Sequence, residues 1–340
     1  MLDKASLTKL RELVTTAQNP YAFYDDDPDG FVSYLLIKKA HEPFDGTIIK
    51  GSPMLEPIYA TKVNKNIIDR VFILDKPLVD TSFVRDVKLP IVWVDHHEPQ
   101  NIGGVTYFNP RVQAPKDRSP TSYIIYKAVG GPLWLAMVGV VGDWYLCPEL
   151  KLLQKKKPKL LSTIKSPPHV LFETQFGTVI KTFAFLLKQP VRTINKFVPE
   201  LLTIKEPEEI LEQKTPAGKM LMKNYLNINK EYEPLLQEAL TKETKNSLVY
   251  TYTALKRSFT GELSNELLHR AKAELIVVAR LKDGEYKMSL RTRKVNLQPI
   301  IKKALVGIQG HGGGHEQACG ACVPEHAFEG FIEKIKREMV

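Results

Sequence analysis

The sequence contains little cysteine and no long apolar run. Its 340 residues include three cysteines, an odd count that excludes a framework of paired disulfides and is typical of a reducing compartment. The longest apolar stretch, residues 132–142, is too short to span a bilayer. The opening residues, MLDKASLTKL, lack the apolar segment of a signal peptide. We therefore expect a cytoplasmic protein that does not enter a membrane.

Acidic residues are fewer than basic ones. Lys and Arg number 48 against 38 Asp and Glu, which gives a formal net charge of +10. Such a balance favours polyanionic partners, nucleic acid among them. The basic, proline-punctuated stretch 151–168 is interpreted as a solvated linker or helix face in preference to a nucleic-acid patch, because runs of charge are usually solvated.

The order of the apolar patterns predicts an α/β fold. Residues 47–50, 71–74 and 91–94 form short, mainly apolar runs, as in strands that are buried on both faces of a parallel sheet, and helical patterns separate them. This alternation predicts a doubly wound, parallel-sheet domain at the N-terminal end. From residue 247 onward strands return, with a hairpin turn at Asp283-Gly284, and predict a smaller α+β domain.

The same patterns predict the domain boundaries. A long helical pattern, with a break near Pro234, lies between the two β-containing regions and is interpreted as a helical connector. The expected parts are residues 1–210, a domain with a helical extension; residues 211–246, the connecting helix; and residues 247–340, the C-terminal domain.

Aspartates collect where the predicted strands end. The stretch FYDDDPDGFVSYLL begins like an EF-hand calcium loop, but its twelfth position counted from Asp25 is Leu36, where that loop needs a glutamate. Ligand sites of open α/β sheets lie outside the carboxyl ends of the strands, and alternate residues of an extended chain point to one side. We therefore expect one site built from Asp25, Asp27, Asp29, Asp75, Asp95, His96, His97 and Asp143.

So many carboxylates in one crevice would repel each other unless cations were bound between them. Oxygen ligands with one or two imidazoles suit Mn²⁺ or Mg²⁺, and a carboxylate can bridge two such ions. The natural chemistry of that arrangement is two-metal hydrolysis of a phosphoester. Taken alone, Asp75 or Asp143 would be interpreted as a turn or N-cap residue, and only their joint occurrence favours a metal site.

Near the C-terminal end, HGGGH (residues 311–315) is interpreted as a phosphate-binding loop. Consecutive glycines expose backbone N–H groups, and the two histidines add donors. The stretch lacks the serine elbow of an esterase and does not follow the dinucleotide-binding pattern. Cys319 and Cys322 are interpreted as packing residues, because a zinc site would need a second ligand pair. The candidate binding residues of this loop are His311, Gly312, Gly313, Gly314 and His315.

Five motifs in order resemble those of the DHH phosphoesterase superfamily. They are DDDPDG, FILD, VDHHEP and VVGDW, followed by GHGGGHEQACGA, which resembles the DHH-associated C-terminal domain. The chain is most similar to RecJ-like nucleases, particularly the short archaeal ones. This resemblance implies two Mn²⁺ ions, with Mg²⁺ as the alternative, held by Asp27, Asp29, Asp75, Asp95, His96 and Asp143.

The resemblance also implies roles for other residues. His97 would approach the scissile phosphate or complete a metal shell, and it is the candidate catalytic residue together with Asp95. Asp25 would replace a histidine that many family members carry before the first aspartate pair. Ser289 and Arg291 match a segment that grips the nucleotide together with the glycine loop, and Arg293 is expected to add charge on the same strand face.

The activity implied is exonucleolytic degradation of single-stranded DNA or RNA, in repair or replication. A groove between the two domains would admit a single strand and exclude a duplex. A replication or repair helicase is a candidate protein partner. One alternative is a nanoRNase or phosphatase acting on short oligonucleotides or on 3′-phosphoadenosine 5′-phosphate. Another is a non-catalytic, Cdc45-like scaffold, against which the retained acids and histidines argue.

Overall fold

A computed structural model describes residues 1–253 and 256–339 of the chain. The chain divides into two compact units, Met1–Tyr225 and Leu226–Val340, and the division falls inside helix α11 (Pro216–Leu240). This helix continues through Pro234, so the expected break is wrong. Tyr232 and Leu236 are fully buried on either side of Pro234 and hold the helical turns before and after the proline in place.

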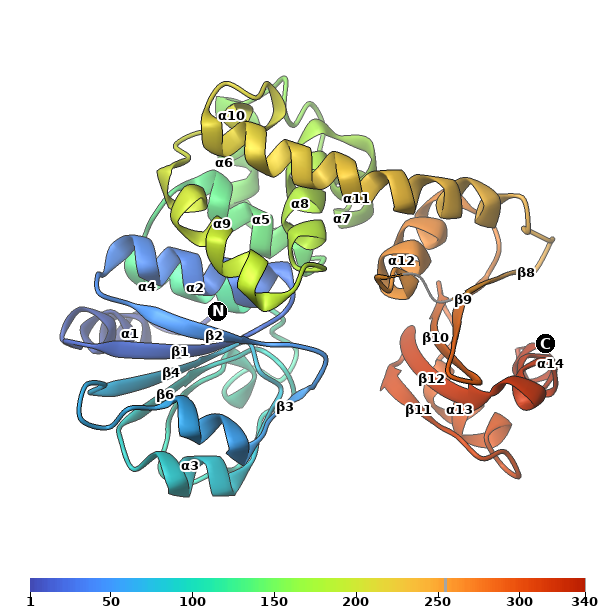
Figure 1. The fold of residues 1–340 in the computed structure, drawn as a ribbon, viewed down its shortest axis with the longest axis horizontal. Coiled ribbons are helices and arrows are strands. Elements are labelled where there is room, and N and C mark those ends of the chain that lie inside the picture. The colour runs from blue at the N-terminus through green and yellow to red at the C-terminus, as the bar shows by residue number, and fades with distance from the viewer. Residues whose placement is uncertain (254–255, 340) are drawn as a thin grey trace. The chain divides into compact units, whose positions relative to one another are not determined.

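The first unit is built on a five-stranded parallel sheet in the order β2-β1-β4-β6-β7 (Figure 1). Alternate residues of the central strand enter two apolar clusters, Leu74 on one face and Ile73 on the other, which explains why these strands are apolar throughout. The predicted doubly wound parallel sheet is confirmed. Its strands are β1 (Pro20–Asp25), β2 (Asp45–Ile49), β4 (Arg70–Leu74), β6 (Ile91–Val94) and β7 (Thr106–Phe108).

Helices cover both faces of this sheet. On one face α1 (Lys4–Thr15), α2 (Pro28–Ala40) and α4 (Thr121–Val129) pack against the strands, and α5 (Leu133–Gly142) packs behind α2 and α4. On the other face lie α3 (Thr81–Val87) and the 3₁₀ helix η1 (Pro57–Lys62). Figure 1 shows α3 below the strands of this sheet and α2, α4 and α5 above them. Two short parallel strands, β3 (Met54–Leu55) and β5 (Leu78–Val79), form a separate pair.

Further helices complete this unit. The basic stretch 151–168 runs from α6 (Pro148–Lys156) to the start of α7 (Pro167–Glu173). Leu160 and Leu161 of that stretch are buried in the main apolar cluster, so it belongs to the first unit and is not a linker. No helix in the described part of the chain is long and apolar enough to cross a membrane. The remaining elements are η2 (Pro110–Val112), α6 (Pro148–Lys156), α7 (Pro167–Glu173), α8 (Gln175–Leu186), α9 (Val191–Thr203) and α10 (Glu208–Leu211).

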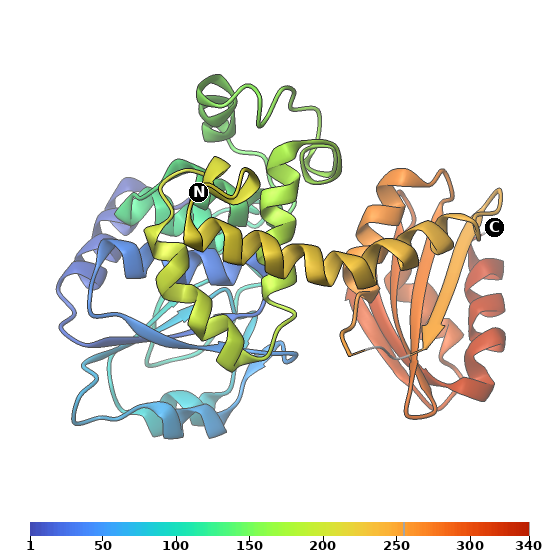
Figure 2. The ribbon, with the colours of Figure 1, turned by 45° about the horizontal axis from the view of Figure 1, so that its top comes forward.

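The second unit contains a five-stranded mixed sheet in the order β11-β12-β10-β9-β8 (Figure 2). The predicted hairpin joins β9 and β10, and Asp283 and Gly284 both have the positive φ angles that a tight turn needs. Its elements are β8 (Ser247–Thr253), α12 (Thr260–Arg270), β9 (Leu275–Lys282), β10 (Glu285–Thr292), α13 (Leu297–Ala304), β11 (His311–His315), β12 (Ala318–Pro324), η3 (Glu325–Ala327) and α14 (Phe328–Glu338).

Candidate metal centre

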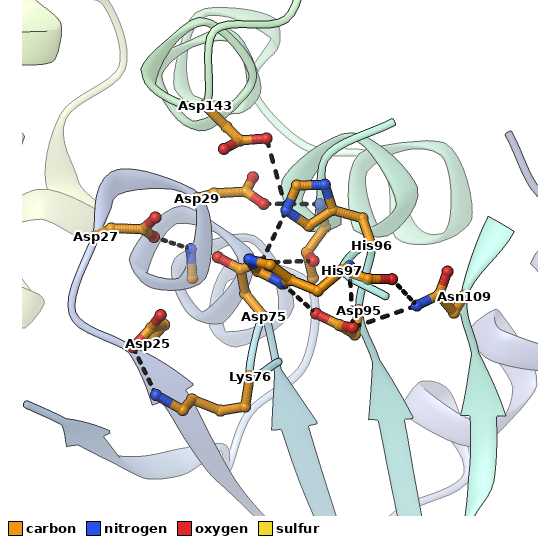
Figure 3. A network of polar contacts seen from close by, with 12 residues as sticks. Asp25, Asp27, Asp29, Asp75, Lys76, Asp95, His96, His97, Asn109 and Asp143 are labelled. Atoms are coloured by element: carbon orange, nitrogen blue, oxygen red, sulfur yellow. Dashed lines mark hydrogen bonds and ion pairs between the residues drawn. The ribbon is translucent and has the colours of Figure 1, made fainter. Parts of the chain in front are cut away.

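The predicted aspartates meet at the carboxyl ends of the central strands of the first sheet (Figure 3). Asp25 is the last residue of β1, Asp75 follows β4 and Asp95 follows β6. Between β1 and β4 the strand order reverses direction, which is the place where open α/β sheets bind ligands. The fold therefore gathers residues that lie far apart in the sequence.

Asp27 and Asp29 reach this site by a different route from the one expected. They do not alternate along a strand but begin α2, where Asp27 is the N-cap and accepts a hydrogen bond from the backbone N–H of Gly30 at 2.9 Å. A Cβ at position 30 would lie 2.8 Å from the backbone nitrogen of Asp25. Glycine is therefore needed here because the helix begins against the end of β1.

The N-terminus of α4 holds Asp29 in place. The fully buried carboxylate accepts hydrogen bonds from the backbone N–H groups of Thr121, at 2.8 Å, and Ser122, at 2.9 Å, and from the Ser122 hydroxyl. A Cβ at Gly139 of α5 would lie 2.5 Å from that hydroxyl oxygen, so the glycine leaves room for it. Sequence reasoning missed Thr121 and Ser122, because their contact with Asp29 joins segments about ninety residues apart.

Asp75 and His96 are shared between three overlapping sets of ligand atoms. His96 Nε2 lies 3.4 Å from Asp75 Oδ1 and 3.6 Å from Asp143 Oδ2. Asp143 is the C-cap of α5, so a helix end delivers it to the site. The sets are Asp75 with His96 and His97, Asp29 with His96 and Asp143, and Asp25 with Asp27 and Asp75, and the ligand atoms of each lie within 4.8 Å of one another.

Asp95 is buried beside His97 and holds its ring. His97 Nδ1 lies 2.8 Å from one Asp95 oxygen, and the other oxygen accepts the backbone N–H of His97 at 3.1 Å. Asn109 Nδ2 donates to Asp95 at 3.2 Å, to the His97 carbonyl at 3.0 Å and to the Tyr107 hydroxyl at 2.8 Å. Asp95 thus orients His97 in this structure, and its direct contact with a metal stays a prediction.

Lys76 is a second residue that sequence reasoning missed. Its side chain is fully buried and donates to Asp25 Oδ1 at 2.8 Å and to the carbonyl of Ser52. The same Asp25 oxygen accepts the backbone N–H of Asp26 at 3.0 Å. One positive charge of the protein itself therefore already faces the most acidic part of the site.

In the second unit, the candidate binding residues other than Arg293 lie on a sheet and not in a loop. HGGGH forms the edge strand β11, paired with β12 over its whole length, so the expected loop is wrong. Ser289 and Arg291 lie on one face of β10, where Arg291 Nε donates to Asn265 Oδ1 at 2.7 Å. Arg293 lies beyond the end of β10 and donates to the Ala271 carbonyl, so it does not share that strand face.

Comparisons with known proteins agree with this architecture. A model of the DHHA1 domain matches residues 245–340. The RecJ of Thermus thermophilus, solved in complex with Mn²⁺, superposes with a TM-score of 0.69 at 13% identity over 98% of this chain. The C-terminal part of the chain therefore matches the DHHA1 domain, and the whole chain has a RecJ-like fold. It spans about half of that RecJ, covering 54% of it.

Two other solved structures share this fold over almost their whole length. The pGpG-specific phosphodiesterase PggH of Vibrio cholerae has a TM-score of 0.52 at 13% identity, and the match covers 94% of this chain and 98% of PggH. Cdc45 of Entamoeba histolytica has a TM-score of 0.55 at 8% identity, covering 98% of this chain and 97% of Cdc45. No curated protein matches the chain significantly in sequence.

The electrostatics of this candidate metal centre fit a divalent cation. Burial, and then the charges of Asp25 and Asp29, raise the pKa of Asp27 to about 7. Burial, followed by the charge of Asp29, also raises the pKa of Asp75 and of Asp143 well above the usual range. Carboxylates in this condition take up protons or bind a cation. Together with the imidazole of His96, whose pKa burial lowers, they form a ligand set that suits Mn²⁺ or Mg²⁺.

Stabilisation by Mn²⁺ is expected to grow as the pH rises. The metal-free fold loses stability from about pH 4, where aspartates of the unfolded chain ionise, up to about pH 7, because the folded-state pKa values are raised. A bound cation removes this penalty, and protons compete with it below about pH 7. Melting temperatures with EDTA and with Mn²⁺ should therefore differ more at about pH 8 than at about pH 5. An equal difference at both pH values would contradict a site made of these carboxylates.

Proposed function

We propose that this protein is a metal-dependent phosphodiesterase that removes nucleotides from single-stranded nucleic acid. The observation that carries the proposal is the overlap of the three ligand sets at the strand ends, where Asp75 and His96 each belong to two of the sets. Overlapping carboxylate and imidazole ligands suit two neighbouring cations, and such pairs are used for phosphoryl chemistry. A role in DNA repair or replication, beside a helicase, is part of the proposal.

The residues divide into ligands and groups that position them. Asp29, Asp75, His96 and Asp143, with Asp27 and Asp25, would hold the ions. Bound there, the ions would activate a water and neutralise the charge that develops on the phosphoryl group. The N-terminus of α4 and the Ser122 hydroxyl keep Asp29 aligned through three hydrogen bonds. Removing such supporting contacts from a metal site commonly weakens it about 10- to 100-fold.

His97 is placed to act on the phosphate. Its Nδ1 faces the buried Asp95, so the other ring nitrogen is left for substrate or metal. Burial alone would lower the pKa of His97, but the hydrogen bond and charge of Asp95 outweigh it and raise the pKa. The ring therefore carries a proton over a wider pH range than an ordinary histidine and can donate it to a phosphate or leaving-group oxygen.

We expect His97→Gln to lower kcat by about 10²- to 10⁴-fold, the usual contribution of a positioned acid or base. Because the three ligand sets contain enough other donors, bound Mn²⁺ should remain near the wild-type amount. Hydrolysis and metal content are measured on the same preparation, with His326→Gln on the exposed surface as the matched control. Loss of Mn²⁺ in step with loss of activity would instead make His97 a ligand and would refute this role.

A polymeric substrate is favoured by charge. The net charge of +10 attracts a long polyanion more strongly than a small one, since each phosphate contact adds to affinity. A second candidate is a phosphodiesterase of short oligonucleotides or small nucleotides. Its support is that PggH has the same fold over 98% of its length, so this fold is compatible with a short substrate.

Digestion of end-labelled strands separates these candidates. Single-stranded DNA and RNA of about 16 nucleotides, the upper end of common site sizes, are labelled at either end and incubated with Mn²⁺ beside a dinucleotide. We expect the long strands to be shortened stepwise from one end. Consumption of the dinucleotide alone would establish the second candidate. Binding of Mn²⁺ without cleavage of any substrate would instead support a scaffold.

A further inference from the structure

The register of the C-terminal sheet places the candidate binding residues in rows across its strands. One face of the sheet contacts α13 and α14 through Leu290 and Cys319, and the opposite face carries Arg291, which bonds to Asn265 of α12. Three successive rows lie on that opposite face. They are Ile276, Arg291, Ala318 and His315; then Val278, Ser289, Gly320 and Gly313; then Tyr252, Arg280, Lys287, Cys322 and His311.

The first two rows contain Ser289, Arg291, Gly313 and His315, which are already expected to grip a nucleotide, and His311 of the same expected set lies in the third row. The third row, called the outer basic row below, adds Arg280 and Lys287, which sequence reasoning did not single out. Every side chain of this row is neutral or cationic. Glu285 lies one row further out, and its carboxylate accepts a hydrogen bond from the Cys322 thiol at 3.4 Å. The outer basic row thus places two cationic side chains, Arg280 and Lys287, side by side next to a row of small residues.

Two observations indicate that the outer basic row is built to receive an anion. Arg280 and Lys287 face each other on neighbouring strands, and like charges in directly opposite positions destabilise a sheet unless something lies between or over them. The Nε of Arg280 is also buried, and it has no hydrogen-bond partner among the residues that the structure describes. A buried donor of this kind is costly until an acceptor reaches it.

We propose that Arg280, Lys287 and His311 form a second phosphate site, for a nucleotide of the same strand beyond the one held by Ser289 and Arg291. The proposal rests on the proposed function and names its substrate class, a polymer longer than a dinucleotide. Rows two residues apart along a strand are separated by about 7 Å, a spacing on the scale of successive phosphates. A dinucleotide would fill only the first rows, whereas a longer strand also reaches the outer basic row.

Binding of oligonucleotides of increasing length tests this site. Fluorescence anisotropy is measured with the full chain in EDTA, so that the readout does not depend on hydrolysis. Wild-type affinity should rise from dinucleotide to tetranucleotide, and Lys287→Gln should remove most of that rise. The slope of log affinity against log salt should become shallower by about 0.7 for the lost contact. Arg280→Gln should act in the same direction, and Lys282→Gln, exposed two residues further along β9, should leave both quantities unchanged.

The outcomes separate this inference from the proposed function. If Lys287→Gln keeps both the length dependence and the salt slope, the second phosphate site is refuted even if the protein hydrolyses DNA. If it weakens dinucleotide and tetranucleotide equally, the residue belongs to the first site and the inference is also refuted. If the protein binds longer strands through Lys287 but hydrolyses none, the site stands and the proposed hydrolysis fails.

Discussion

Asp75→Asn is expected to abolish hydrolysis and, at the same time, to stabilise the metal-free protein. Asp75 belongs to two of the three ligand sets, so activity should fall by more than the roughly 100-fold that loss of a supporting contact can cause. Asparagine keeps the shape of the side chain and tolerates the left-handed backbone at this position, where φ is 59°. The Thr121 hydroxyl can still donate to the amide oxygen.

The gain in stability has a pH signature. Burial and neighbouring carboxylates raise the pKa of Asp75, so ionising it costs stability at any pH above about 4, where the unfolded residue is charged. Asparagine removes that cost, and we expect a gain of at least about 1 kcal/mol in EDTA at pH 7, because one pKa unit corresponds to 1.36 kcal/mol. At about pH 3 the gain should vanish, since both states are then protonated.

Urea unfolding in EDTA at the two pH values provides the measurement. Asp45→Asn, which alters an aspartate whose side chain is 80% exposed, is the matched control and should leave activity and stability nearly unchanged. A loss of stability in Asp75→Asn at pH 7 would mean that Asp75 is a structural residue, and the metal-site account of its burial would then be wrong.

Lys76→Met is expected to produce the largest loss of stability. The fully buried ammonium pairs with Asp25 Oδ1 at 2.8 Å, and removing one partner of a buried ion pair commonly costs about 3–5 kcal/mol because the other charge is left behind. Asp25→Asn should rescue part of this loss, since no uncompensated charge then remains. Lys62→Met, at an exposed position of η1, is the control.

A double-mutant cycle in EDTA measures the coupling between the two residues. We expect the double variant to be more stable than the sum of the single effects by about 1–3 kcal/mol, the range for residues in contact. Additive effects would show that Lys76 stabilises the fold through its packing or through Ser52, and not through Asp25. Excess Mn²⁺ should stabilise Lys76→Met more than wild type, because a cation can replace the missing charge.

The arrangement of the metal centre could be predicted where chain connectivity alone determines it. Apolar runs located β4 and β6, and parallel strands end at the same edge, so Asp75 and Asp95 were expected to meet. Asp27 and Asp29 were correctly placed near them but for the wrong reason, since they cap and begin α2 instead of extending β1.

Other features depend on contacts that the sequence does not display. Lys76 looked like an ordinary charged residue after a strand, and only the folded chain shows it pointing at Asp25. Ser122 meets Asp29 because Gly139 leaves space for its hydroxyl. The glycines of β11 are poor strand formers, and pairing with β12 overrides that preference. Arg280 and Lys287 became neighbours only once the register of β9 and β10 was known.

Cation-dependent cleavage is the most direct test of the central claim. The protein is stripped with EDTA, dialysed, and given a labelled single strand with and without Mn²⁺. We predict no cleavage without the ion, cleavage when Mn²⁺ is added, and none with Asp75→Asn under either condition. Cleavage that persists in EDTA, or that Asp75→Asn retains, would contradict the account.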